Sequence, residues 1–185
     1  VGSPTLNGVV TWNNSGTLDI GGAHRVLVYN GGVVNNLAGG IINDTTTAGS
    51  PFEGNGSTST FTNTGTFNKN AGSAATQNFS VNTWTNPGTI NVNTGTLNID
   101  RAGTDTGTYQ VGTGATLLVS SGTRSFNGTT LTGTGVLSMT GGEMNFATNA
   151  TFGAGNPSLS LTGGTRSGAG NLTVNGALNL GGTTF

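Results

Sequence analysis

The feature that most constrains the fold of this chain is an internal repeat. Residues 11–20 (TWNNSGTLDI) and residues 83–92 (TWTNPGTINV) both read Thr-Trp-x-Asn-x-Gly-Thr-apolar-x-apolar. Residues 60–69 give a third copy, with phenylalanine in place of tryptophan, and residues 34–42 a weaker fourth. The four copies begin near residues 11, 33, 60 and 83. A period of this length predicts a fold in which one structural unit stacks on the next.

The C-terminal half carries a different motif at a similar period. Four short apolar segments, each closed by glycine, begin at residues 117, 137, 159 and 178. The segment Gly-Thr-Arg-Ser at 122–125 also returns at 164–167, which is two such periods later. Residues 181–185 resemble the opening of one more repeat, so we expect a chain cut from, or open towards, a longer array.

Within each repeat the apolar residues alternate with polar ones over short runs, as in Ile90-x-Val92 and Leu97-x-Ile99. This period of two is typical of strands. Glycine and asparagine separate the runs, and both tolerate the positive φ angles of sharp corners. The 35 glycines in 185 residues also disfavour helices. The doubled motif at 86–92 and 93–99 is interpreted as two successive sides of one coil.

Together these patterns predict an all-β fold, a parallel β-solenoid in the form of a right-handed β-helix. Residues 1–185 would form a single domain of about eight rungs of roughly 19–24 residues each. We expect Leu, Ile, Val, Phe and Met to face inward, and Thr, Asn and Ser to face outward. The polar residues 44–57 lie in the longest interval and are predicted to form a loop excursion. An antiparallel sandwich would not explain why the same motif recurs.

The amino-acid composition excludes several classes of binding partner. Only 6% of the residues are charged, and the five Lys and Arg are scattered, so no basic surface for nucleic acid is expected. The chain has no cysteine, which excludes disulfides and thiolate metal sites. No apolar run has the roughly 18 residues needed to cross a membrane. We predict no cofactor and no metal site.

The repeat pattern is most similar to that of known families at residues 163–180 (GGTRSGAGNLTVNGALNL). They resemble the repeats of bacterial autotransporter passengers and filamentous-haemagglutinin-like adhesins. The resemblance covers most of residues 11–185 and is one of repeat pattern. It implies a right-handed parallel β-helix displayed outside the cell, and it carries over no catalytic residues.

Candidate catalytic residues are few. The densest cluster is Asp100 and Arg101 with Asp105, and paired acids on one groove are what a polysaccharide lyase or hydrolase needs. The alternative interpretation, which we favour, is a solvated turn between two strands. His24 is the single histidine and is expected at a corner. We therefore assign no catalytic, cofactor-binding or metal-binding residue.

Threonine arrays offer another alternative. Threonines alternate from Thr58 to Thr66, and Thr-Gly-Thr recurs along the chain. Regularly spaced threonines on a flat face are typical of several ice-binding proteins. The simpler interpretation is that most of these threonines lie at corners and on outer faces because threonine favours β-strands.

The function predicted from these observations is structural. We expect an extracellular, non-enzymatic protein: a surface stalk, an adhesin segment, or a filament subunit that stacks through its open strand edges. Its partners would be further copies or repeats of the same chain, joined end to end, or surface glycans. A β-helical polysaccharide lyase or hydrolase is the first alternative, and an ice-binding protein is the second.

Overall fold

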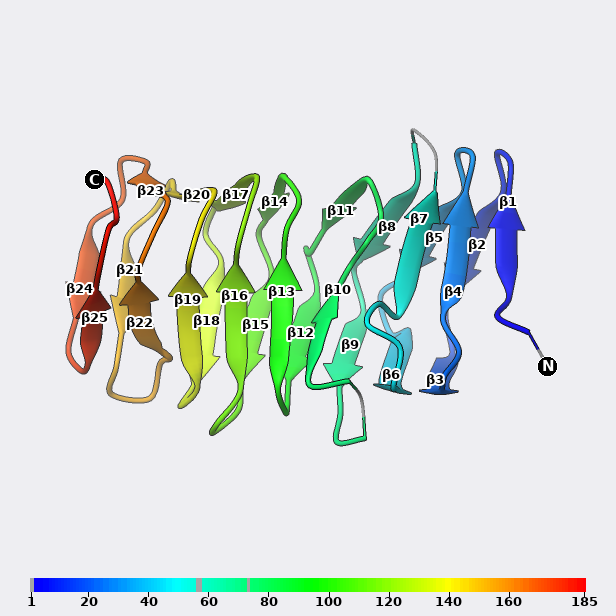
Figure 1. Ribbon diagram of the computed structural model, residues 1–185, viewed down its shortest axis with the longest axis horizontal. Coiled ribbons are helices and arrows are strands. Elements are labelled where there is room, and N and C mark those ends of the chain that lie inside the picture. The colour runs from blue at the N-terminus through cyan, green and yellow to red at the C-terminus, as the bar shows by residue number, and fades with distance from the viewer. Residues whose placement is uncertain (1, 56–57, 73) are drawn as a thin grey trace.

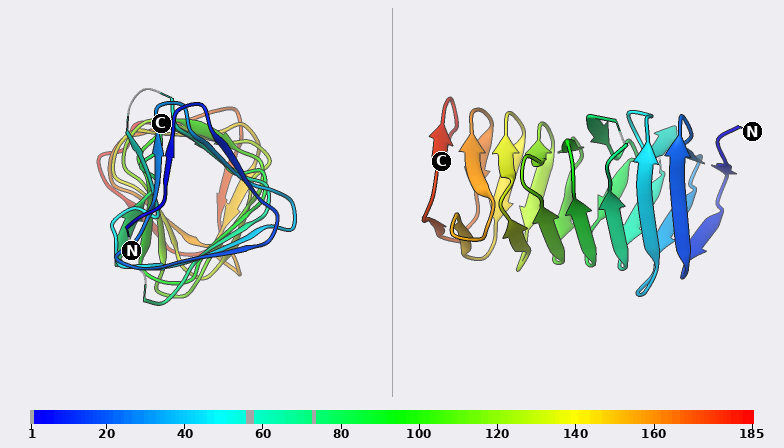
Figure 2. Two further views of the ribbon diagram at one scale, coloured as in Figure 1. Left: turned by 90° about the vertical axis from the view of Figure 1, so that its right-hand side faces the viewer. Right: turned by 90° about the horizontal axis from the view of Figure 1, so that it is seen from below.

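The chain winds into a rod of stacked turns (Figure 1). The computed structural model describes residues 2–55, 58–72 and 74–185. These residues form 25 strands and no helix, and the strands form six sheets in which the pairings are parallel. Each turn contributes three strands, so eight turns are followed by one strand of a ninth. Viewed along the axis, the turns enclose one three-sided outline (Figure 2). The predicted all-β parallel β-solenoid of about eight rungs is confirmed.

Three faces result, each built from every third strand. Face 1 contains β1 (Thr5–Asn7), β4 (Val26–Tyr29), β7 (Phe52–Asn55), β10 (Thr76–Asn78), β13 (Thr96–Ile99), β16 (Thr116–Val119), β19 (Val136–Met139), β22 (Ser158–Leu161) and β25 (Leu178–Leu180). Face 2 contains β2 (Thr11–Asn14), β5 (Val33–Asn36), β8 (Thr60–Asn63), β11 (Thr83–Thr85), β14 (Gly103–Asp105), β17 (Thr123–Phe126), β20 (Glu143–Phe146) and β23 (Thr165–Ser167). Face 3 contains β3 (Thr17–Gly22), β6 (Ile41–Thr46), β9 (Thr66–Lys69), β12 (Thr89–Val92), β15 (Thr108–Val111), β18 (Thr130–Gly133), β21 (Ala150–Phe152) and β24 (Leu172–Val174).

The register of the strands reproduces the sequence repeats. Successive turns of face 2 align the predicted repeat starts, Thr11, Val33, Thr60 and Thr83. On face 1 the C-terminal starts align in the same way, at Leu117, Leu137, Leu159 and Leu178. The doubled motif at 86–99 forms β12 and β13, two successive sides of the coil, as predicted.

The interior is filled by the alternating apolar residues. Ile90, Val92, Leu97 and Ile99 are fully buried. Aromatic rings pack within and between turns: the ring centroids of Phe52 and Phe61, in the same turn, lie 4.6 Å apart, and those of Phe126 and Phe146, in successive turns, lie 5.2 Å apart. Burial of this continuous apolar column is the main favourable contribution to folding, because it scales with the apolar area removed from water.

The loop predicted for residues 44–57 is wrong at residues 44–46 and 52–55, which lie in strands, and only residues 47–51 form a connection between strands. β6 continues through Asp44 to Thr46, and β7 begins at Phe52. Asp44 and Thr46 are buried, and the Thr46 hydroxyl donates to the carbonyl of Gly22 at 3.0 Å. Polar residues therefore occupy inward ladder positions here, which a polar run in sequence does not reveal. Residues 56 and 57 lie outside the described residues.

Candidate functional site

A column of asparagines lies inside the corner between faces 2 and 3. Asn14, Asn36, Asn63 and Asn86 occupy this corner in turns 1 to 4, and all four are buried. The Nδ2 groups of the first three donate to the Oδ1 of the next asparagine, at 2.8, 2.7 and 2.8 Å in turn. All four Nδ2 groups also donate to backbone carbonyls of the following turn, those of Ile41, Thr66, Thr89 and Thr108. The expectation that asparagine faces outward is wrong here, because each amide is satisfied by its neighbours in the stack.

The glycine of the same motif allows the corners to approach one another. A methyl group on Gly88 would lie 2.3 Å from the carbonyl oxygen of Gly65, and one on Gly107 would lie 2.0 Å from that of Gly88. The φ angles of these three glycines are not positive, in contrast to Gly95 and Gly122. Positive φ was predicted for corner glycines in general. At this corner glycine is instead required because only a residue without Cβ permits such close backbone contact.

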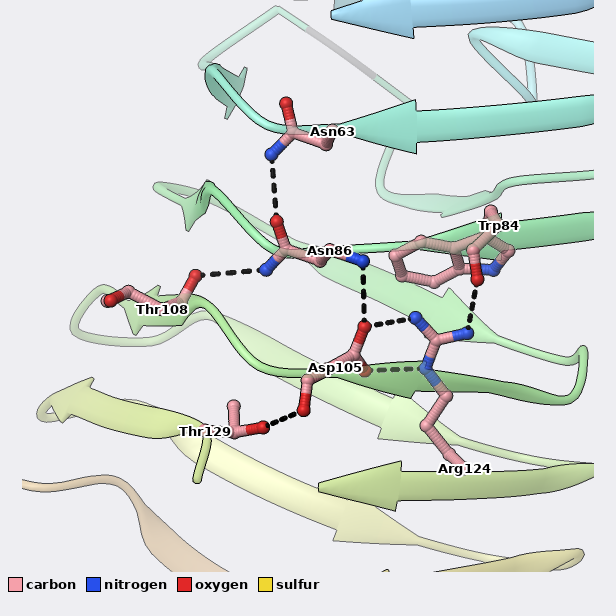
Figure 3. A network of polar contacts seen from close by, with 7 residues as sticks. All are labelled: Asn63, Trp84, Asn86, Asp105, Thr108, Arg124 and Thr129. Carbon is pink, nitrogen blue, oxygen red and sulfur yellow. Dashed lines mark hydrogen bonds and ion pairs between the residues drawn. The ribbon is translucent and has the colours of Figure 1, made fainter. Parts of the chain in front are cut away.

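Turn 5 ends the asparagine column with a carboxylate. Asp105 lies opposite Asn86, whose backbone N–H donates to Asp105 Oδ1 at 3.1 Å. Arg124, one turn further on, donates from Nε to Asp105 Oδ2 at 2.6 Å and also contacts Oδ1 through Nη2. Both side chains are fully buried. Figure 3 shows this bidentate pair below the asparagines.

The guanidinium of Arg124 reaches across turn 5 to turn 4. Its Nη1 donates to the carbonyl of Trp84 at 2.9 Å, and its Cζ lies 3.8 Å from the centroid of the Trp84 ring. Gly103 is the register partner of Arg124, and a methyl group there would lie 2.3 Å from Nη1. The absence of a side chain at Gly103 therefore makes room for the arginine. Three turns are held together by one cation through charge, hydrogen bonds and a cation–π contact.

Burial sets the electrostatics of this network. It raises the pKa of Asp105, and the neighbouring Arg124 guanidinium works in the opposite direction. A charged group so deep in the core costs several kcal/mol unless it is paired, so loss of either partner is expected to be strongly destabilising. No solvent reaches either side chain. The arrangement suits a structural connection between turns.

The acidic cluster predicted at Asp100, Arg101 and Asp105 is not brought together. Asp100 Oδ1 lies 4.0 Å from Arg101 Nε at the surface, whereas Asp105 is buried in the core. The solvated turn expected for these residues is therefore wrong at Asp105. One signal could have identified it: Asp105-Thr-Gly-Thr108 repeats the pattern of Asn86-Pro-Gly-Thr89. Arg124 and Trp84 were not foreseen as its partners.

A second buried polar group lies in turns 2 to 4. Burial raises the pKa of Asp44 to about 6, partly offset by the Thr46 N–H, which donates to Oδ1 at 3.0 Å, and by Gln77 and Lys69. Lys69 is the register partner of Asp44 and donates to the carbonyl of Ala74 at 2.8 Å. Burial also lowers the pKa of Lys69.

His24 lies exposed in the turn after β3, beside a shallow recess at the N-terminal end of the rod that Asp19 and Arg25 also line. Arg25 pairs with Glu53 of β7. Within residues 2–55, 58–72 and 74–185, no three His, Asp or Glu side chains gather where a metal ion could bind.

Several threonines form an outward column on face 3. Thr66, Thr89, Thr108 and Thr130 are register partners on four successive strands. Of the alternating threonines in the sequence, Thr60 and Thr62 lie on β8, and Thr64 lies exposed at the corner before β9.

The described part of the chain holds no helix long and apolar enough to cross a membrane. We compared the chain with protein-family models, with curated proteins and with solved structures, and none of them matches it.

Proposed function

We propose that this chain is a structural, non-enzymatic β-solenoid that acts outside the cell as part of a stalk, adhesin or filament. The observation that carries the proposal is the use of the buried polar groups. The asparagine column and the Asp105–Arg124 pair join one turn to the next and are buried in the core. Polar residues placed in this way maintain the register of a rod.

Low charge and an exposed apolar strand support the same proposal. The chain carries a net charge of −1, so stacked copies repel one another little. On β25 the apolar Leu178 and Leu180 are 42% and 54% exposed. Exposed apolar strands are templates for strand addition. The likeness of residues 163–180 to autotransporter and haemagglutinin-type repeats supports a bacterial surface location.

Electron microscopy of the purified chain over a range of concentrations tests the filament form of this proposal. We expect rods that lengthen with concentration, and Leu180→Lys to shorten them because it places a charge on the exposed edge. Leu118→Lys is the matched control, since Leu118 lies on the same face in the middle of the rod. Monodisperse monomers at high concentration would exclude self-stacking.

The threonine column favours ice binding as a second candidate function. Thr66, Thr89 and Thr108 repeat at the spacing of neighbouring strands, roughly 4.8 Å. Thermal hysteresis would measure this activity. We expect Thr89→Lys to abolish it and Thr83→Lys, on face 2, to leave it intact. Absence of hysteresis in the unmodified chain would dismiss this candidate.

A further inference from the structure

One strand of face 1 carries an aromatic side chain on its outer surface. Along β4, Val26 and Val28 are buried, whereas Leu27 and Tyr29 are half-buried and face outward. Among the described residues, Tyr29 is the only aromatic residue at an outward position of a strand, because the others in strands belong to the core or pack against it. The second outward residue of later strands on this face is small or aliphatic: Asn98, Leu118, Ser138 and Ser160.

Asparagines flank Tyr29 on both sides. Asn7 of β1 and Asn55 of β7 are its register partners, and both are exposed. The three strands lie side by side on face 1 (Figure 1). Side chains stand roughly perpendicular to a sheet, so the long tyrosine side chain extends beyond the shorter asparagines beside it. An aromatic ring therefore rises between two amide groups at the surface.

The amide of Asn7 is held in place by Asn30. Asn30 follows β4 with a φ of 51°, in the left-handed region, and its Nδ2 donates to Asn7 Oδ1 at 2.8 Å. The N–H of Gly32 closes this corner by donating to the Tyr29 carbonyl at 3.0 Å. Within the part of the chain that the structure describes, Asn7 Nδ2 donates to no other group and Asn30 Oδ1 accepts from none. One donor and one acceptor are thus available beside the ring.

The surroundings of the ring carry no net charge. Strands β1, β4 and β7 contain one charged residue, Glu53, and Arg25, which directly precedes β4, pairs with it. Because the two charges compensate each other, this surface has no complementarity to an anionic or a cationic ligand. A neutral ligand suits it best.

A pyranose sugar matches this combination of groups. One face of a hexopyranose presents C–H groups that pack on an aromatic ring, and its hydroxyl groups both donate and accept hydrogen bonds. We propose that Tyr29, Asn7 and Asn30 form a binding site for a neutral hexopyranose unit of a glycan. The sugar packs on the Tyr29 ring, accepts a hydrogen bond from Asn7 Nδ2 and donates one to Asn30 Oδ1.

This site rests on the adhesin form of the proposed function, and it adds the class of ligand and the residues that bind it. A single sugar on an open strand surface is bound weakly, because most of its own surface stays in water. Several rods displayed together would raise the overall affinity through multivalency.

Saturation-transfer NMR with the complete chain tests the proposal. The probes are the neutral methyl glycosides of glucose, galactose, mannose and N-acetylglucosamine. We expect at least one of them to receive saturation at its ring hydrogens, and Tyr29→Ala to weaken its binding about tenfold. Tyr29→Phe should retain most of the affinity, because the ring remains. Asn7→Ala should weaken binding about threefold through the loss of one hydrogen bond.

Leu118→Ala is the matched control. Leu118 is also a half-buried outward residue of face 1, but it lies in the sixth turn. Its truncation should leave glycoside binding unchanged, and thermal unfolding of each variant would separate a loss of binding from a loss of fold. No saturation transfer to any of the four glycosides, equal binding by folded Tyr29→Ala, or an equal loss in Leu118→Ala would each overturn the proposal.

The outcome is independent of the filament test. Filaments without glycoside binding would retain the stalk or filament role and remove the sugar site. Glycoside binding by a protein that stays monomeric at high concentration would retain the sugar site and remove self-stacking.

Discussion

The two halves of the rod fill the same corner in different ways. In turns 1 to 4 the inner position is an asparagine that bonds along the axis. In turns 6 and 7 it is Phe126 and then Phe146, whose rings stack with centroids 5.2 Å apart. The flanking strands keep their register although the corner after Phe126 is one residue longer than the corner after Asp105, so a parallel solenoid accepts either a hydrogen-bonded or an aromatic column at one position. What it requires is that each residue match its neighbours above and below.

Asp105 and Arg124 lie where one kind of column changes into the other. Asp105 accepts from the last asparagine of the polar half through the N–H of Asn86. Phe126, which follows it in register, begins the aromatic half. The Asp105 carboxylate accepts the hydrogen bond of the last asparagine in the column, and the Arg124 guanidinium neutralises its charge within the core. The comparison therefore predicts that the largest effects of substitution occur at this junction.

Arg124→Ala should be the most damaging change. It leaves Asp105 buried and unpaired, and we expect a loss of about 4 kcal/mol in the free energy of unfolding, measured by denaturant titration. Replacing both residues, as Asp105→Leu with Arg124→Met, should restore most of this loss, because no buried charge remains. If the double variant were as unstable as Arg124→Ala, the unpaired buried charge would not be the cause of the lost stability.

The polar half should also respond to pH. The folded-state pKa of Asp44, about 6, lies above its ordinary value of 3.8 because of burial. The unfolded chain therefore gives up this proton at lower pH than the folded one. The stability that Asp44 contributes should be fully present below about pH 4 and be lost as the pH rises to about 6, by about 3 kcal/mol. Lys69 is the charged neighbour that opposes this effect.

Asp44→Asn provides the control for the pH effect. The amide cannot ionise, so the part of the decline in the free energy of unfolding between pH 4 and 7 that Asp44 causes should disappear. Chemical denaturation at several pH values would measure it. An unchanged decline in the variant would assign the effect to another group.

The asparagine column should contribute less per residue than the junction. Asn63→Leu removes two donated hydrogen bonds and leaves Asn86 Oδ1 without its donor. We expect a loss of about 2 kcal/mol by thermal or chemical unfolding. Phe146→Leu, the corresponding change in the aromatic half, should cost about 1 kcal/mol. Equal losses would mean that the amide bonds add nothing beyond packing.

The contrast between the apolar and the polar positions of the core also explains which parts of the fold could be predicted from the sequence. The repeat starts and the inward Ile90 and Leu97 were predictable, because apolar alternation reports directly on which face is buried. Asn86 and Asp105 were not assigned to the interior, because a polar residue near glycine is equally typical of an exposed turn. Their burial depends on partners one turn away, some twenty residues distant in sequence. Asp44 was assigned to a loop for the same reason.

A pair of glycines gives the smallest and most specific test of the comparison. Gly88, in the polar half, has an ordinary φ but would bring a methyl group within 2.3 Å of the Gly65 carbonyl oxygen. Gly128, in the aromatic half, has a φ of 69° and nothing within 4 Å of such a group. We expect Gly88→Ala to cost about 2 kcal/mol through steric overlap, and Gly128→Ala about 1 kcal/mol through backbone strain alone.

D-Alanine at each position, introduced by chemical ligation, would separate the two causes. At Gly128 the D-residue adopts a positive φ without strain, so stability should recover. At Gly88 a positive φ is not used, so the D-residue should bring no such recovery. Recovery at both positions would mean that corner glycines are selected for their φ angle throughout the rod, and that close approach of the turns is not what distinguishes the polar half.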